Sequence, residues 1–224
     1  MVKVEGGSFK MGDDQDIDSR AIEQPVHTVS LKTFSIAKTE TTVLQWKTYC
    51  NAYGRKMPKT PEWGWKDDHP IVNLSWDDAV AYCSWLSDKT GNLYRLPTEA
   101  EWEFAARGGQ QSKGFKFSGG QSIDGIGWIY ENSNGSPKQV AQKRANELGL
   151  YDMSGNAWEW CHDWYGYYAA EAQVNPQGPT SGNSRVLRGG SYSWGADASR
   201  VAYRDRGLPR YPSESYGFRV VISQ

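Results

Sequence analysis

The segment Arg95-Leu-Pro-Thr-Glu-Ala-Glu-Trp-Glu-Phe-Ala-Ala-Arg-Gly108 contains the signals for both ends of a helix. Thr98 followed three residues later by Glu101 forms a capping box, in which each side chain accepts a hydrogen bond from the backbone N–H of the other residue. Gly108 stands where helices commonly end in a left-handed residue. The spacing predicts a helix over residues 98–107.

Three acids follow one another on alternate positions of this segment, Glu99, Glu101 and Glu103. Two of them could form a catalytic pair. However, the helix dipole favours acids in a first turn, and Glu101 is already explained as the partner of the cap. We therefore interpret all three acids as structural.

Two more helices are expected earlier in the chain. Thr42 begins a second capping box, with a glutamine three residues on, and Ser75 begins a third, with an aspartate three residues on. Apolar residues fall on one face of each following segment, as in an amphipathic helix. We predict helices near residues 42–53 and 76–88.

The helical signals stop after about residue 108, and short aromatic and glycine-rich pieces follow. Strand-like runs of β-branched and aromatic residues are expected at 27–36, 185–192, 200–204 and 218–222. Helices early and strands late favour an α+β fold. The 24 Gly and 10 Pro indicate many turns and little regular secondary structure, and no linker divides the chain, so one domain over residues 1–224 is expected.

The composition excludes several classes of protein. Lys+Arg 25 against Asp+Glu 26 leaves a formal charge of -1, which argues against a nucleic-acid binder that depends on a basic surface. The 11 Trp and 13 Tyr argue against disorder. No apolar window is long enough to cross a membrane, and the first residues do not begin a signal peptide. A cell-surface or virion location is therefore expected only if a leader has been removed, and a cytoplasmic one otherwise.

The turn within Leu150-Tyr-Asp-Met-Ser-Gly-Asn-Ala-Trp-Glu-Trp160 has an acid at each end, Asp152 and Glu159. Calcium binds carboxylate and backbone carbonyl oxygens, and such a turn can supply both. A hydrogen-bonded turn between two aromatic core positions, Trp158 and Trp160, explains the same residues. The residues alone favour neither interpretation.

The chain resembles the formylglycine-generating enzyme (sulfatase-modifying factor) family over nearly its whole length. The motifs are Val4-Glu-Gly-Gly-Ser-Phe-Lys-Met-Gly12, Gln24-Pro-Val-His27, His69-Pro-Ile-Val-Asn-Leu-Ser-Trp76, Arg95-Leu-Pro-Thr-Glu-Ala-Glu-Trp102, Gly149-Leu-Tyr-Asp-Met-Ser-Gly-Asn-Ala-Trp-Glu-Trp160, Arg188-Gly-Gly-Ser191 and Gly217-Phe-Arg-Val220. The resemblance implies a C-type-lectin-like fold.

The resemblance also carries expectations about metals. Enzymes of this family oxidise a cysteine with copper held by two cysteines, and the matching positions here are Trp194 and Ser199. Neither is a thiolate, the soft ligand that Cu(I) needs, so no copper and no oxidase chemistry of this kind are expected. One calcium of the family is expected, at a site that matches Asp152, Met153, Gly155, Ala157 and Glu159.

The segment after Arg185 resembles the variable region of diversity-generating retroelement proteins, which are bacterial or phage proteins. Fixed residues alternate there with assorted ones. The candidate changeable, ligand-binding residues are Ser193, Trp194, Gly195, Asp197, Ala198, Asp205, Arg206, Gly207, Leu208, Ser213, Glu214 and Ser215. In that family such residues line a ligand-binding face on a lectin-like scaffold.

Two functions from different classes remain. The first is a non-catalytic display protein that binds a protein or another macromolecule, but not a nucleic acid, through residues 193–215. Rigid aromatic and arginine side chains, which commonly carry binding energy, support it. The second is an enzyme, or an accessory to one, that works without the copper cysteine pair.

Overall fold

The computed structural model describes residues 1–16 and 19–223. Its three α-helices are α1 (Val43–Tyr53), α2 (Trp76–Thr90) and α3 (Glu99–Ala106). Each begins with a complete capping box, and α1 and α2 end at left-handed glycines. The three predicted helices are therefore confirmed, because side chains at their first turns satisfy backbone N–H groups that no helix can satisfy alone.

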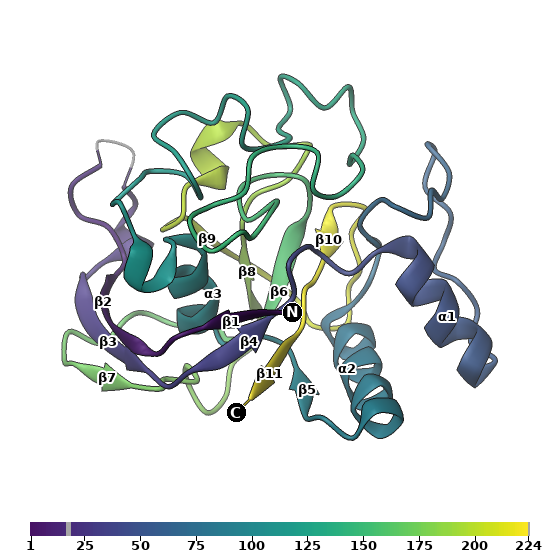
Figure 1. Ribbon diagram of the computed structural model, residues 1–224, viewed down its shortest axis with the longest axis horizontal. Coiled ribbons are helices and arrows are strands. Elements are labelled where there is room, and N and C mark those ends of the chain that lie inside the picture. The colour runs from purple at the N-terminus through teal and green to yellow at the C-terminus, as the bar shows by residue number, and fades with distance from the viewer. Residues whose placement is uncertain (17–18, 224) are drawn as a thin grey trace.

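The strands form three small sheets (Figure 1). The first is antiparallel and has the order β1 (Val2–Val4), β4 (Phe34–Ile36), β11 (Val221–Ser223), β5 (Tyr94–Arg95). The second has the order β10 (Tyr216–Gly217), β6 (Trp158–Trp164), β8 (Arg185–Arg188), β9 (Arg204–Gly207). The third has the order β2 (Gly7–Met11), β3 (His27–Leu31), β7 (Gln173–Val174). The first sheet joins strands from both ends of the chain.

The strand predictions need correction in detail. The expected strand 27–36 is two strands, since β3 pairs with β2 whereas β4 pairs with β1 and β11. The run 185–192 ends as a strand at Arg188, because two left-handed glycines follow. The strand expected at 200–204 begins only at Arg204, and the one expected at 218–222 is β11.

β6, the strand at the centre of the second sheet, was not predicted. Its sequence, Trp-Glu-Trp-Cys-His-Asp-Trp, mixes apolar and charged residues without a simple alternation. Most of it is buried, acids included, because the acids meet buried partners. Alternation identifies a strand only where one face is exposed to solvent.

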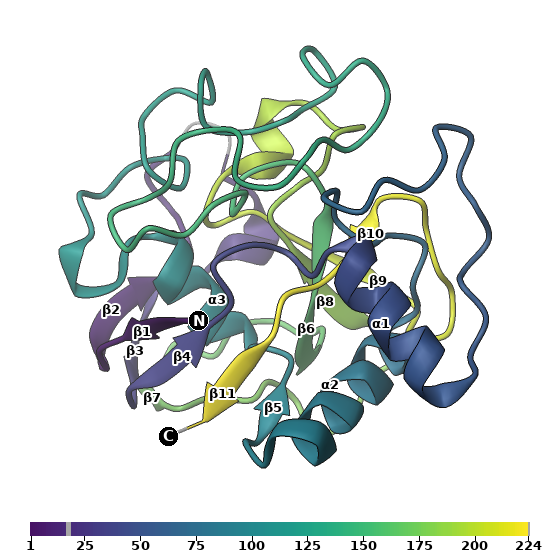
Figure 2. The same cartoon turned by 45° about the vertical axis from the view of Figure 1, so that its right-hand side comes forward.

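The apolar core consists of two main clusters. One packs α1 and α2 against Trp158, Trp160 and Phe218, and the other packs α3 against the first and third sheets. Figure 2 shows α1 and α2 together at one side of the molecule and α3 deeper inside, behind β4. The second sheet contributes to both clusters, so it connects the two halves of the core.

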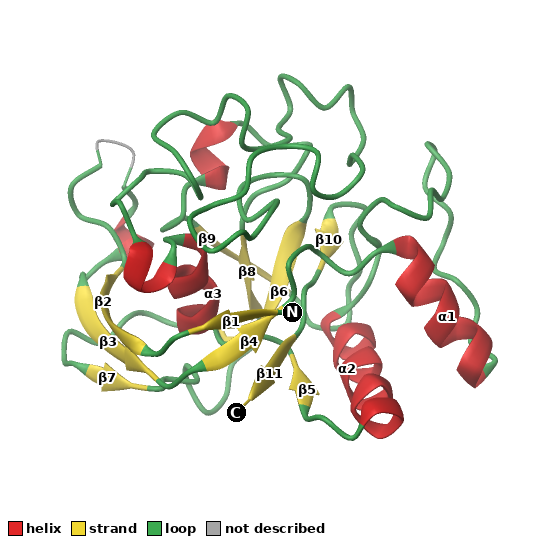
Figure 3. Cartoon of the chain, in the orientation of Figure 1, coloured by secondary structure: helices red, strands yellow, loops and turns green. Residues whose placement is uncertain are grey.

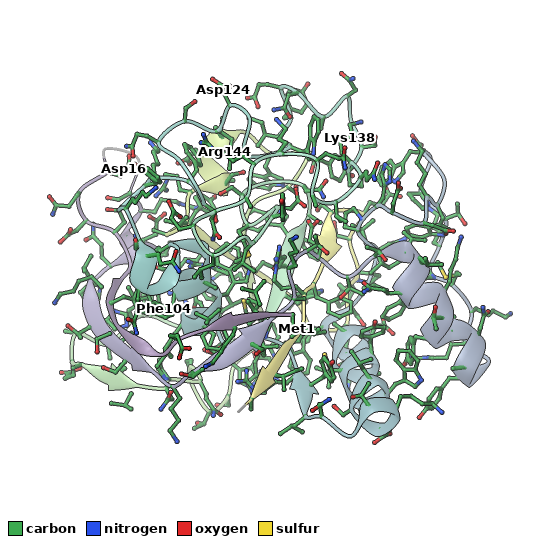
Figure 4. All side chains as sticks on the ribbon, viewed as in Figure 1. Met1, Asp16, Phe104, Asp124, Lys138 and Arg144 are labelled. Atoms are coloured by element: carbon green, nitrogen blue, oxygen red, sulfur yellow. The ribbon has the colours of Figure 1, made fainter. Side chains whose placement is uncertain are left out.

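Loops make up much of the chain, as Figure 3 shows. The longest runs from α3 to β6 and contains one short 3-10 helix, η2 (Gly109–Gln111). It encloses a small apolar cluster of Phe117, Ile123, Ile126 and Ile129, and Figure 4 labels three polar residues on it, Asp124, Lys138 and Arg144. Two more 3-10 helices are η1 (Ala21–Glu23) and η3 (Ala196–Ser199). Within the described residues, no helix is long and apolar enough to cross a membrane.

Candidate functional site

Buried ion pairs hold the C-terminal segment in place. Arg188, at the end of β8, donates to Glu99 at 3.0 Å and to Glu103 at 2.6 Å. Arg204, at the start of β9, makes two hydrogen bonds to Glu99, at 2.8 and 2.6 Å. Each of these four side chains is at most 5% exposed. The acids of α3 are thus structural, as the sequence indicated.

Two further arginines are fixed in the same way. Arg200 donates to both carboxylate oxygens of Glu23, at 2.7 and 2.8 Å, and its side chain is 1% exposed. Arg219 donates to both carboxylate oxygens of Glu159, each at 2.7 Å. Planar guanidinium groups match carboxylates in this two-bond geometry. We call Arg188, Arg200, Arg204 and Arg219 the arginine framework.

The predicted changeable residues divide by exposure. The exposed ones are Ser193, Trp194, Asp197, Arg206 and Leu208, and the half-buried ones are Gly195, Asp205, Ser213 and Glu214. The other three, Ala198, Gly207 and Ser215, are buried. Any side chain at Gly207 would clash with the Trp160 ring, because the ring lies where a Cβ would stand. These three positions face the protein interior, unlike the other nine predicted residues.

Exposed Trp194 and half-buried Glu214 lie beside aromatic rings that are buried or half-buried. Trp194, 45% exposed, makes an edge contact with Trp158 at 6.0 Å between ring centroids. Tyr192 makes an edge contact with Trp63 at 5.4 Å, and its hydroxyl reaches the Glu214 backbone oxygen at 3.5 Å. We call this group the aromatic face. Arg206 lies apart from it, with its guanidinium over the Tyr165 ring at 4.9 Å.

Trp63, which belongs to the aromatic face, was not predicted from the sequence. It lies in the loop between α1 and α2, about 130 residues from Trp194 in the chain, and belongs to none of the motifs above. The only indication in the sequence was that Trp63 is an aromatic residue in a loop rich in Pro, Gly and Trp.

The two positions that match the copper cysteines differ in environment. Trp194 is half exposed, while Ser199 is fully buried in η3 and its Oγ has no hydrogen-bond partner within the described residues. An indole offers only an N–H donor, and a hydroxyl is a poor ligand for Cu(I). The three cysteines, Cys50, Cys83 and Cys161, are buried and unpaired elsewhere, in α1, α2 and β6.

The candidate calcium turn fits a cation at one of its two acids. Asp152 is 4% exposed and has a left-handed backbone, with φ 57°. Its Oδ2 accepts from the Ala141 N–H at 2.7 Å, whereas no described residue donates to its Oδ1. Burial raises the pKa of Asp152 to about 6. A buried carboxylate oxygen without a donor suits calcium, which prefers such ligands.

Glu159, the second acid, does not fit a cation as it stands. Arg219 occupies both of its oxygens, and the Trp102 Nε1–H donates to Oε2 at 2.8 Å. The carbonyl-bearing positions of the predicted ligand set, Met153, Gly155 and Ala157, are buried in the turn. No three His, Cys, Asp or Glu side chains of residues 1–16 and 19–223 come close enough together to hold a metal by themselves.

A third acid, Glu40, meets this turn and was not predicted. It is 1% exposed and accepts from the Ala157 N–H at 2.9 Å and from the Asn156 side chain at 2.8 Å. Burial and the charges of Asp152 and Glu159 raise the pKa of Glu40 well above its usual range. Three carboxyl groups therefore face one buried guanidinium, with the Lys143 ammonium also near Asp152, and either a proton or a bound cation can relieve this excess of acid. The sequence around Glu40 gives no indication that it is part of a metal site, because only folding brings it to the turn.

The architecture, with its short helices, three small sheets and long loops, defines a protein of the formylglycine-generating-enzyme type of C-type-lectin-like fold. Comparison with known proteins matches the sulfatase-modifying factor enzyme 1-like domain over residues 1–224. The chain belongs to this family, and the α+β, lectin-like prediction is confirmed.

Individual relatives show the breadth of the family. The chain is 36% identical to serine/threonine-protein kinase pkn1 of Chlamydia caviae over 98% of this chain, but that match spans only 37% of the kinase. It is 33% identical to the formylglycine-generating enzyme of Streptomyces coelicolor, over 97% of this chain and 87% of the enzyme. The structure also resembles Treponema denticola variable protein 1, with TM-score 0.87 and 27% identity over 100% of this chain and 95% of that one.

Proposed function

We propose that this chain is a non-catalytic binding protein that presents residues of its C-terminal segment to a protein or another macromolecule. The observation that carries the proposal is the contrast within that segment. The arginine framework is at most 2% exposed, whereas the residues between its members include exposed Ser193, Trp194, Asp197, Arg206 and Leu208. A rigid framework with changeable residues between its fixed points suits a display function, because substitutions there leave the fold intact.

The chemistry of the aromatic face supports macromolecular binding. Trp194 is a rigid aromatic residue that is 45% exposed, and such residues commonly anchor interfaces. Tyr130, 70% exposed, lies beside it, since its N–H donates to the Trp194 carbonyl at 2.9 Å. The likeness to a variable protein agrees with the proposal.

The decisive experiment is a comparison of closely related sequences together with the neighbouring DNA. We expect a reverse-transcriptase gene and a near-copy of the 3′ coding segment, with differences confined to the exposed positions of residues 193–214. Differences spread evenly over framework and exposed positions, without such a near-copy, would contradict the proposal.

We also propose that the turn binds one calcium, through Asp152 Oδ1 and backbone carbonyls of Met153, Gly155 and Ala157. Glu159 contributes by holding Arg219 rather than by direct ligation. A cation at Asp152 would balance the excess of buried acid described above.

A catalytic role without the copper pair is the second candidate. The observation that favours it is Ser199, whose buried Oγ is free of protein partners among the described residues and lies in the segment where the family's enzymes hold copper. Turnover of a cysteine-containing peptide, tested below, distinguishes this candidate from display.

A further inference from the structure

A cavity of about 250 Å³ opens on a part of the molecule that the display proposal does not use. It lies between α3, the end of β6, the start of β3 and the loops before and after β7. None of its described lining residues belongs to the predicted changeable set. A volume of this size holds about eight water-sized groups, so it suits a small ligand or a single side chain.

The floor of the cavity carries a buried acid with one unused oxygen. Asp163 is 3% exposed, and its Oδ2 accepts from the Glu99 N–H at 2.9 Å. No hydrogen bond from any described residue reaches its Oδ1. Burial, and then the charge of Glu99, raises the pKa of Asp163 to about 8. A cation beside this carboxyl would favour its ionised form.

A second free acceptor lines the same cavity. His27 is 4% exposed, and its Nδ1 lies 3.0 Å from the Pro25 carbonyl oxygen. A carbonyl can only accept, so Nδ1 carries a proton, and in the neutral imidazole Nε2 is then an acceptor. No described residue donates to Nε2. The Tyr168 ring packs on the imidazole at 4.8 Å between ring centroids, and the Arg204 guanidinium lies over the same ring at 4.0 Å.

The one guanidinium among the described lining residues already uses four of its five N–H donors. Arg204 makes two hydrogen bonds to Glu99 and one each to the carbonyls of Ile22 and Gly166. An anionic ligand would therefore find few free donors at the buried end of the cavity, whereas a ligand rich in donors would find two free acceptors.

We propose that this cavity binds a primary alkylammonium group, with Asp163 as its counter-ion and His27 Nε2 as a second acceptor. An ammonium has three N–H donors and no acceptor, which complements the two free acceptors. Its alkyl chain would lie against apolar lining residues such as Ala100 and Pro179. The group can belong to a free amine or to a lysine side chain of another protein.

The test measures binding of n-butylammonium chloride to the folded protein by thermal shift and by NMR, against sodium chloride at equal ionic strength and against n-butanol. We expect butylammonium to bind at least about tenfold more tightly than the neutral butanol, because a charged hydrogen bond is lost with the alcohol. This comparison uses wild-type protein only, so it does not depend on a variant that folds. Equal binding of the two compounds, or no binding at about 10 mM, would overturn the proposal.

Asp163→Asn then identifies the site. The amide oxygen can still accept from the Glu99 N–H, but the charge is gone, so butylammonium binding should fall at least about tenfold. Asp88→Asn is the matched control, because Asp88 is exposed on α2 outside the cavity, and should bind like wild type. Unchanged binding in Asp163→Asn would refute the proposed site. A short lysine peptide separates the two sources: binding of the peptide indicates a partner's lysine, and binding of the free amine alone indicates a small molecule.

Discussion

The Arg219 guanidinium and the Glu159 carboxylate form a fully buried ion pair with two hydrogen bonds of 2.7 Å. Both side chains are 0% exposed. Arg219 also donates to the carbonyls of Ala37 and Tyr151, at 3.1 and 2.9 Å. One residue of the Gly-Phe-Arg-Val motif thereby connects the beginning of β6, the start of the candidate calcium turn and the segment after β4.

Removing one partner of this pair should destabilise the protein strongly. Arg219→Ala leaves the Glu159 carboxylate buried without its cation, and a broken buried pair typically costs about 3–5 kcal/mol. Urea denaturation measures the change. Arg206→Ala is the control, because Arg206 is exposed, and should stay within about 0.5 kcal/mol of wild type. A loss below about 1 kcal/mol for Arg219→Ala would show that the pair is not structural.

Calcium should stabilise the folded protein through Asp152. A ligand that binds only the folded state stabilises it by roughly 2.7 kcal/mol at a hundredfold excess over its dissociation constant. We expect wild type to melt at a higher temperature in calcium than in chelator, and Asp152→Asn to lose most of this difference. The amide keeps an acceptor for the Ala141 N–H, so the variant tests the charge. Identical wild-type melting in both conditions would identify a plain turn.

Copper-dependent oxidation of cysteine should not occur. The positions that match the copper ligands are Trp194 and Ser199, which provide no thiolate. Incubation with copper and a sulfatase-type cysteine peptide should leave the peptide unchanged, as followed by mass spectrometry. A matched incubation with copper alone gives the background. Aldehyde formation above that background would favour the enzymatic alternative.

Substitutions should separate the displayed positions from the framework. Trp194→Ala should cost little stability, because the ring is 45% exposed, whereas Phe218→Ala should cost about 3–5 kcal/mol, because that side chain is 0% exposed. Denaturation curves give both values. Emission of Trp194, isolated by comparison with Trp194→Phe, should respond to a water-soluble quencher. A large stability loss in Trp194→Ala with no quenchable emission would place Trp194 in the core.

Stability should fall as pH rises through the neutral range, in part because of Asp163. Burial and the neighbouring acids raise the pKa of Asp163 to about 8 in the folded protein, whereas it is near 4 in an unfolded chain. Between these two pH values the folded protein keeps the Asp163 proton and the unfolded chain loses it. Below about pH 4 both states are protonated, so the stabilisation is fully present there and is lost as the pH rises toward 8. Arg204 opposes the shift by favouring the charged form.

Asp163→Asn removes this titration, so its stability should decline less than that of wild type from about pH 5 to about pH 8. Urea denaturation at several pH values measures the decline, with Asp88→Asn, an exposed position on α2, as the control that should follow wild type. Parallel curves for wild type and Asp163→Asn would show that Asp163 is already ionised at the acidic end of this range.

The local sequence determined the helices, because their signals lie within a few residues of one another. Thr42, Ser75 and Thr98 each meet the backbone of a residue three positions later, and Gly54 ends α1 through its own left-handed backbone, with φ 64°. These capping signals need no information about distant parts of the chain. The lectin-like fold was indicated differently, by the resemblance of motifs along the whole chain to one family.

Only the tertiary structure decided which residues meet. Glu40 reaches the turn of Asp152 across more than 100 residues, and Trp63 joins Tyr192 in the same way. Folding also brings Arg219 to Glu159, so the Glu159 carboxylate binds a guanidinium and is not free to bind calcium. The physical reason is the cost of burying acids. A carboxylate is buried only where a hydrogen-bond donor or a cation lies next to it, and tertiary packing, not the neighbouring sequence, decides which group that is.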